Sequence, residues 1–237
     1  MKLYFNGCSH TYGDDLHDKN HAWPALIARA SGHDFVNDSR PGGSNQRIIY
    51  RTIKHIHQFD KIYVAWSYTN RFTRWRSDNN HETNFNINLI NSKYGNTKEY
   101  QEYGRLHYAY WHNELYAFKL WLQDIWMLQS FLTHHGKSYV MINASNNLID
   151  QWTVDRENFN SNVKSLLCFD IMDDIQLLAE HEEIQSLVQR INKKHFIGWN
   201  QWWITKLHGQ YQVGPTSHLL EDGHRAIAEY ITANDTN

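Results

Sequence analysis

A serine in the first turn of the sequence is the strongest candidate for a catalytic nucleophile. The turn Gly7–Gly13 (GCSHTYG) directly follows a short apolar segment and leads toward a helix. Gly7 relieves crowding in front of Ser9, so the turn can expose the Ser9 hydroxyl and present backbone N–H groups beside it. The same residues also fit an ordinary strand-to-helix turn with a capping serine. A dinucleotide-binding fingerprint is excluded, because it needs glycine at the positions of Ser9 and Tyr12.

Two further loops contain groups that can stabilise negative charge. Arg40–Asn45 (RPGGSN) has two adjacent glycines ahead of a helix start, and backbone N–H groups there can bind an anion or an oxyanion. Ser67–Arg71 (SYTNR) follows a strongly predicted strand and carries Asn70, whose amide can donate a hydrogen bond to developing negative charge. An ordinary glycine turn with Ser44 or Asn45 as the helix N-cap explains the first of these loops equally well.

A histidine near the end of the chain is the candidate general base. His218 lies in Gly214–His224 (GPTSHLLEDGH), just before the last predicted helix, from where its imidazole can reach a serine at the end of a sheet. Most of the 16 histidines are expected at the surface or in packing roles. His224 is expected to have such a role, because it lies inside the final helix.

The elements that must position these residues alternate between strands and helices. Short apolar runs predict strands at 2–6, 34–37, 61–66 and 138–143. Helical spacing of apolar residues predicts helices at 21–30, 45–57, 113–135 and 222–232. The pattern near 195–197 leaves a fifth strand open. Alternation of this kind indicates parallel strands joined by crossover helices.

The chain is predicted to form one α/β domain over residues 1–237, with a central parallel sheet between two layers of helices. Residues 71–110 are polar, rich in Asn and Tyr and without sustained periodicity, so we expect a large insertion over one face. A helical extension is expected at about 146–194, strongest at 175–191. Ligands of open parallel sheets bind at the carboxyl ends of the strands, which is where the three loops described above are expected to lie.

Composition and charge exclude several classes of protein. With 23 Lys and Arg against 25 Asp and Glu, the net charge of −2 gives no basic surplus for a nucleic-acid backbone, and no nucleic-acid partner is expected. Two cysteines are too few for a disulfide scaffold or a four-thiolate zinc site. The neighbouring His134 and His135, like the pair His218 and His224, lack the spacing of a helical metal motif. Neither a metal nor a cofactor is therefore expected.

The sequence contains no signal-type segment at its N-terminus and no apolar run long enough to span a membrane. These features predict a cytoplasmic protein from a reducing compartment. They leave the oligomeric state open.

The four candidate blocks together resemble the SGNH hydrolases, the GDSL-type esterase and lipase superfamily. The first block of that family reads roughly G-D-S-x-T-x-G, and it is GCSHTYG here. The resemblance assigns the nucleophile to Ser9, the oxyanion glycine to Gly42, the oxyanion asparagine to Asn70 and the histidine to His218. It also implies the family's flavodoxin-like α/β/α fold.

The blocks GCSHTYG, PGGSN, AWSYTNRF and GPTSHLLEDGH are especially similar to divergent SGNH-type proteins of tailed bacteriophages. The match spans both ends of the chain and leaves about 71–196 unmatched except for the order of elements. Cys8 stands where the family has Asp, and the block around Asn70 lacks the family's glycine and continues with Arg71.

The main departure from the family pattern lies beside the histidine. The family's catalytic Asp stands three residues before the histidine, and this position is Pro215 here. Since proline cannot orient an imidazole, His218 must be held by a backbone carbonyl or by an acid from elsewhere, such as Glu221 or Asp222. Loss of the orienting acid costs about 10⁴ in rate in a serine protease triad, so a weak or absent activity is an expected alternative.

The resemblance implies a serine esterase acting on a carboxylic ester, such as an O-acetylated carbohydrate or a short-chain ester. The N–H groups of Ser9 and Gly42 and the Asn70 amide would form its oxyanion hole. The alternative is an inactive protein with the same fold that serves as a carbohydrate-binding or phage structural module. In that case the aromatic side chains of the insertion and of 198–203 (GWNQWW) would offer stacking surfaces, and a phage origin would place the protein in the virion.

Overall fold

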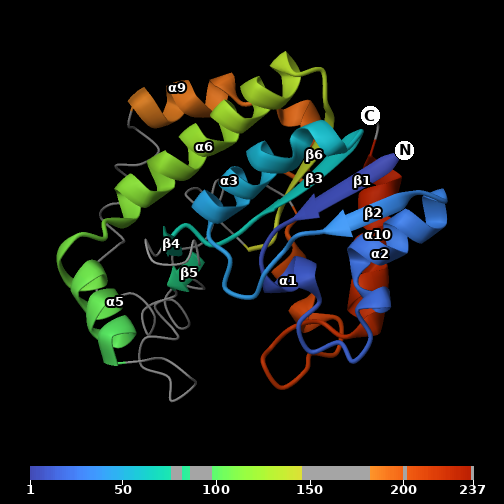
Figure 1. Cartoon of the computed structure of the whole chain (residues 1–237), viewed down its shortest axis with the longest axis horizontal. Helices are drawn as coiled ribbons and strands as arrows, with labels where there is room; N and C mark the ends of the chain where they lie inside the picture. Colours follow the sequence, from blue (N-terminus) through green and yellow to red (C-terminus); the bar gives the residue numbers. More distant parts are fainter. Residues whose placement is uncertain (76–81, 86–97, 146–181, 200–201, 236–237) are drawn as a thin grey trace.

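The computed structural model describes residues 1–75, 82–85, 98–145, 182–199 and 202–235. Its centre is a five-stranded parallel sheet with the strand order β2-β1-β3-β6-β7 (Figure 1). The strands are β1 (Lys2–Asn6), β2 (Asp34–Asn37), β3 (Lys61–Trp66), β6 (Ser138–Asn143) and β7 (Phe196–Ile197). The sequence left open whether a fifth strand forms near 195–197. The structure contains this strand, β7, which pairs in parallel with the end of β6.

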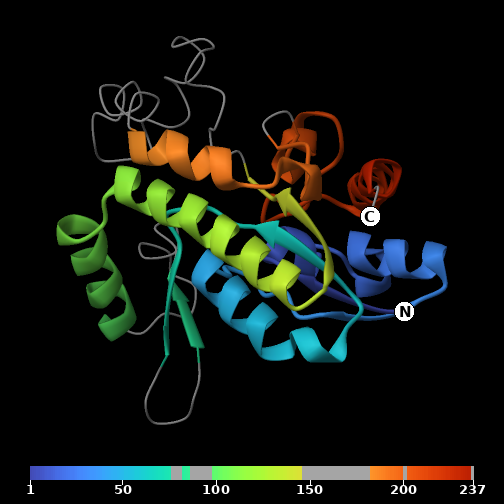
Figure 2. The ribbon, with the colours of Figure 1, turned by 90° about the horizontal axis from the view of Figure 1, so that it is seen from above.

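Two layers of helices cover the sheet. One face carries α3 (Asn45–His55), α6 (Glu114–His134) and α9 (Glu182–Arg190), and the other carries α2 (Trp23–Ser31) and α10 (Glu221–Asn234), as Figures 1 and 2 show. Every residue of β3 is buried, because alternate side chains of this central strand enter the two opposite cores. The predicted three-layer α/β/α fold is therefore confirmed.

The helix limits differ from the predicted ones by at most two residues. Pro24 lies in the first turn of α2, and Gly32 ends that helix in the left-handed conformation with φ +67°. The helix predicted at 45–57 stops at His55 and continues as a short 3₁₀ turn, Ile56–Gln58. No described helix is both long and apolar enough to cross a membrane.

The segment predicted to be an insertion contains regular structure in its described part. An antiparallel hairpin of β4 (Phe72–Trp75) and β5 (Glu82–Phe85) is followed by α5 (Lys98–Tyr110). Phe72, Phe85 and Tyr108 form a small apolar cluster of their own. The hairpin and α5 were not predicted from the sequence, because too few of their side chains are apolar to give a periodic pattern. Of the helical extension expected at 146–194, residues 146–181 lie outside the described residues, and α9 matches the rest of the prediction.

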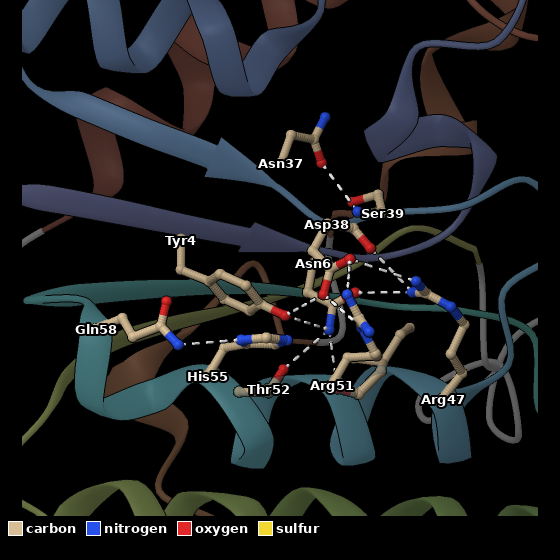
Figure 3. A network of polar contacts seen from close by, with 11 residues as sticks. Tyr4, Asn6, Asn37, Asp38, Ser39, Arg47, Arg51, Thr52, His55 and Gln58 are labelled. Atoms are coloured by element: carbon tan, nitrogen blue, oxygen red, sulfur yellow. Dashed lines mark hydrogen bonds and ion pairs between the residues drawn. The ribbon is translucent and has the colours of Figure 1, made fainter. Parts of the chain in front are cut away.

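A buried polar network ties the ends of β1 and β2 to α3 (Figure 3). The Asp38 carboxylate accepts hydrogen bonds from the Tyr4 hydroxyl at 2.8 Å and from Arg51 at 2.7 and 2.8 Å, and it lies 3.5 Å from Nη2 of Arg47. Arg47 is fully buried and donates from Nη1 to the Asp38 carbonyl oxygen at 3.0 Å. Burial alone would raise the pKa of Asp38, but the bonds from Arg51 and Tyr4 and the two guanidinium charges hold it below the usual value.

Replacing Asp38 with Ala should lower the free energy of unfolding by about 3 kcal/mol, because the buried Arg47 then lacks its counter-ion. Urea denaturation at pH 7 measures this loss. The pKa of Asp38 is lowered on folding, so its contribution is present at neutral pH and disappears as the pH falls below the ordinary value of 3.8. Asp34→Ala on the exposed edge strand is the control, with an expected change within about 0.5 kcal/mol. Equal unfolding free energies for the two variants would contradict this account.

Candidate active site

Ser9 is the first residue of the short helix α1 (Ser9–Tyr12), directly beyond the carboxyl end of β1. The helix N-cap is Cys8 and makes no side-chain capping bond, so Ser9 is not the capping residue that the alternative interpretation required. A Cβ atom at Gly7 would lie 2.3 Å from Oγ1 of Thr11, which confirms that this glycine relieves crowding. The turn closes at Gly13 with φ +84°.

The glycine loop packs against the Ser9 turn. The N–H of Arg40 donates to the Gly7 carbonyl oxygen at 3.3 Å, and a Cβ atom at Gly43 would lie 3.1 Å from the same oxygen. Gly42 adopts a left-handed conformation with φ +70°. Ser44 caps α3 by accepting a hydrogen bond at 3.3 Å from a backbone N–H of its first turn, so the capping interpretation of this residue is correct. A Cβ atom at Gly42 would instead meet Cβ of Asn84, at 3.9 Å.

The loop after β3 is anchored by Asn45. Its Oδ1 accepts from the Ser67 N–H at 2.8 Å, and its Nδ2 donates to the Ser67 carbonyl oxygen at 3.2 Å. Further along, the backbone carbonyl oxygen of Asn70 accepts the Tyr108 hydroxyl of α5 at 2.6 Å. The Asn70 side-chain amide makes no hydrogen bond with any described residue. Tyr108 of α5 therefore holds the backbone of Asn70, while the side-chain amide of Asn70 can still donate a hydrogen bond to a ligand.

His218 lies beside the Ser9 turn although more than two hundred residues separate them in the chain. Its ring centroid is 4.7 Å from that of His10, the residue after Ser9. Oγ1 of Thr216 lies 2.9 Å from Nδ1 of His218. With Nδ1 engaged by a hydroxyl, Nε2 is the ring nitrogen left for proton transfer. No hydrogen bond joins the Ser9 hydroxyl to His218 in this structure, and catalytic hydrogen bonds are often long before substrate binds.

The carboxylate that holds the His218 loop is Asp15. Its Oδ2 accepts hydrogen bonds from the N–H of Thr216 at 2.9 Å and from that of His218 at 3.2 Å, and it lies 3.7 Å from Nδ1 of His218. Gly214 permits this approach, since a Cβ atom there would lie 2.4 Å from Cβ of Asp15. Burial would raise the pKa of Asp15, but hydrogen bonds from Thr216 and His218 outweigh it and keep the pKa low. Asp15 is therefore a charged carboxylate at neutral pH.

The acids expected to orient His218 have other partners. Oε1 of Glu221 lies 3.2 Å from Nδ1 of His21, and Oδ1 of Asp222 lies 3.4 Å from Nη1 of Arg225. Both carboxylates are exposed at the start of α10. Sequence reasoning missed Asp15 because no family block includes it; its only signal is its place two residues after the GCSHTYG block.

The charges around His218 oppose one another. Burial lowers the pKa of its imidazole below 6.5, Asp14 and Asp15 raise it, and Arg71 lowers it. The net shift is downward, so the ring is neutral and able to accept a proton at pH 7. The pKa of the adjacent His10 is well below its usual value, mainly through burial.

Other side chains that the sequence singled out have structural roles. His224 is buried, and its Nδ1 accepts the backbone N–H of Trp23 at the start of α2, which confirms the packing role expected for it. Trp199 and Trp202 are buried too, and the Trp199 ring stacks with that of Trp121. Within the described parts of the chain, no group of three or more His, Cys, Asp or Glu is arranged to hold a metal ion.

The sequence matches the model of DUF6071, a family of unknown function, over residues 6–162. The chain belongs to this family. The DUF6071 match includes Ser9, Gly42 and Asn70 and ends before His218. None of the curated proteins matches the sequence.

Comparison with solved structures shows that this DUF6071 protein has the SGNH hydrolase fold, as the sequence resemblance predicted. The crystal structure of TesA is similar with a TM-score of 0.51 at 10% identity, over 99% of this chain and 97% of that chain. The esterase EstA from Pseudoalteromonas sp., inhibited by monoethylphosphonate, gives a TM-score of 0.51 at 8% identity over 98% and 95% of the two chains. A lipolytic protein of the G-D-S-L family from Veillonella parvula gives 0.48 at 14% identity, over 98% and 97%.

Replacing Gly214 with Ala should lower the free energy of unfolding by about 1–3 kcal/mol, because the added methyl group overlaps Asp15. Chemical denaturation measures the change. Gly209→Ala is a matched control, since no heavy atom lies within 4 Å of the added carbon there and neither glycine has a positive φ. The packing of Asp15 against the last loop would be refuted if the two variants unfolded alike.

Proposed function

We propose that the protein hydrolyses carboxylic esters, with Ser9 as the nucleophile and His218 as the general base. The observation that carries the proposal is the convergence of the first and last loops, in which Asp15 binds the backbone on both sides of Ser217 and His218 packs against His10. This contact supports the proposal, because the loops that carry Ser9 and His218 meet at the carboxyl edge of the sheet, where ligands of such folds bind.

In the first step, Oγ of Ser9 attacks the ester carbonyl carbon while Nε2 of His218 accepts the hydroxyl proton. The N–H groups of Ser9 and Gly42 and the Asn70 amide stabilise the oxyanion of the tetrahedral intermediate. The intermediate expels the alcohol, which takes the proton from His218, and leaves an acyl group on Ser9. Water then attacks the acyl carbon while His218 accepts one of its protons. The bond from the acyl carbon to Oγ of Ser9 breaks, Oγ takes the proton back from His218, and the carboxylic acid is released.

Asp15 and Thr216 replace the family's acid in this scheme. Oγ1 of Thr216 lies 2.9 Å from Nδ1 of His218. The scheme requires the proton on Nδ1, so that Nδ1–H donates to this hydroxyl and Nε2 can accept the Ser9 proton. When His218 is protonated, the Asp15 carboxylate at 3.7 Å stabilises the imidazolium. The proline at the family's Asp position is thus compatible with a working base.

The substrates we propose are O-acetylated carbohydrates or short-chain esters. For the alternative of an inactive binding module, Trp199 and Trp202 offer no stacking surface because they are buried among core side chains, whereas Tyr110 and Trp111 are exposed at the end of α5. EstA, which shares the fold, is an esterase inhibited by a phosphonate, so phosphonate probes suit a direct test.

Replacing Ser9 with Ala should reduce hydrolysis of 4-nitrophenyl acetate by at least about a thousandfold and abolish labelling by a fluorophosphonate, because both reactions need the hydroxyl. Intact-protein mass spectrometry detects the label, and a spectrophotometric assay measures the rate. Ser31→Ala is the control, since this serine only bonds carbonyl oxygens within α2. Equal rates for wild type and Ser9→Ala, without any labelling, would favour the binding module.

Replacing Asp15 with Asn should lower kcat by about 10² to 10⁴, as loss of the orienting acid does in serine proteases. It should also move the acidic limb of the pH–rate profile further down. His218 loses activity when protonated, and its pKa is already below 6.5 with Asp15 present. Because the Asp15 charge raises that pKa, its removal lowers it. Asp222→Asn is the control, and a profile for Asp15→Asn that coincides with it would exclude the positioning role.

A further inference from the structure

Arg71 is a partly buried cation in the loop after β3, next to the proposed oxyanion side chain. Its Nη1 donates to Oγ of Ser67 at 2.9 Å, and its guanidinium group lies 4.6 Å from the ring centroid of Tyr68. Its Nε is buried without a hydrogen-bond partner, and its Nη2 makes no hydrogen bond with a described residue. The group is therefore held in place by two neighbours and keeps donors unused.

No carboxylate of the described residues forms an ion pair with Arg71. Other cations around the sheet differ in this respect: Arg47 and Arg51 pair with Asp38 at 3.5 and 2.7 Å, and Lys61 pairs with Asp235 at 2.7 Å. A partly buried charge without a counter-ion costs free energy in the unliganded protein. A substrate that brings a negative charge would recover this cost.

The charge of Arg71 influences the proposed base. Burial is the main reason why the pKa values of His218 and of His10 are low, and the Arg71 charge lowers both further. A cation in this place weakens the base and hinders its protonation during the reaction. If position 71 acted only on the general base, a neutral residue would suit it better than a cation. The positive charge of Arg71 is therefore better explained by a negative charge on the substrate.

We propose that Arg71 binds a negatively charged group of the substrate, so that the enzyme prefers esters carrying an anion close to the scissile bond. The inference rests on the ester hydrolysis proposed above and specifies its substrate class. The flat guanidinium fork matches the oxygens of a carboxylate or a phosphate, and the half-buried Tyr68 ring lies 4.6 Å from it. The anion belongs either to the acyl part or to the alcohol part of the ester.

Four esters separate these two cases. 4-Nitrophenyl acetate and phenyl acetate are neutral, 4-nitrophenyl hydrogen succinate has a charged acyl group, and 4-acetoxybenzoate has a charged alcohol. We expect the wild type to prefer one charged ester over its neutral counterpart, 4-nitrophenyl acetate or phenyl acetate, by about 10- to 100-fold in kcat/KM, as a charge-assisted hydrogen bond allows. Arg71→Met should abolish this preference by raising KM for the charged ester alone, and Arg71→Lys should keep part of it.

Arg74→Met is the matched control, because Arg74 lies three residues further on and donates to the exposed Tyr103 hydroxyl. Its preference should equal that of the wild type. Absence of any charge preference in the wild type would overturn the proposal. A fall in kcat by the same factor for neutral and charged esters in Arg71→Met would also overturn it, since that result indicates an oxyanion donor or a damaged fold.

A binding measurement makes the proposal independent of turnover. Calorimetry with monoethyl succinate on Ser9→Ala should give a dissociation constant about tenfold lower than on Ser9→Ala/Arg71→Met if the charged acyl group is the ligand, and 4-hydroxybenzoate should do so if it is the alcohol. Binding of this kind without fluorophosphonate labelling of wild type would refute the esterase and retain the anion site. Labelling without charge-dependent binding or preference would refute the anion site and retain the esterase.

Discussion

The candidate site depends on one carboxylate that joins the two ends of the chain. Asp15 follows the first block, and its Oδ2 accepts the backbone N–H groups of Thr216 and His218 in the last loop. A residue in the left-handed conformation supplies this contact, since φ of Asp15 is +66°, and a glycine faces it at position 214. The contact adds to the bridge between Val213 and Leu219 and to the buried Leu219 side chain, which hold the same loop. The contact between Asp15 and the last loop therefore requires a left-handed backbone at Asp15 and a glycine at position 214.

Charged side chains have different partners in the scaffold and at the candidate site. Beneath the site, Asp38 forms ion pairs with both Arg47 and Arg51, and the network of Figure 3 fixes the loop that begins after β2. At the carboxyl edge of the sheet, in contrast, Arg71 has no acidic partner among the described residues, and its field reaches His218. Paired charges determine where the backbone lies, and the unpaired charge is available to a ligand.

The sequence was informative where the determinants are local. Apolar runs and helical spacing located the five-stranded sheet's long strands and its covering helices, because burial imposes those periods directly. The turn around Ser9 and the position of His218 followed from motif spacing. Asp15 did not, because its partners Thr216 and His218 are more than two hundred residues away and no local pattern encodes that pairing. Likewise the two-residue strand β7 is too short to carry a period, and the β4–β5 hairpin is defined by Phe72 stacked on Phe85 across its strands.

The central claim is that Ser9, His218 and Asp15 form one catalytic unit. A crystal structure of the protein after reaction with a small fluorophosphonate tests it most directly. The account predicts a covalent bond from Oγ of Ser9 to phosphorus, Nε2 of His218 within hydrogen-bond distance of the adduct, and Asp15 still bound to the N–H groups of Thr216 and His218. An adduct on another residue, or a Ser9 adduct with His218 turned away and Asp15 released, would contradict it.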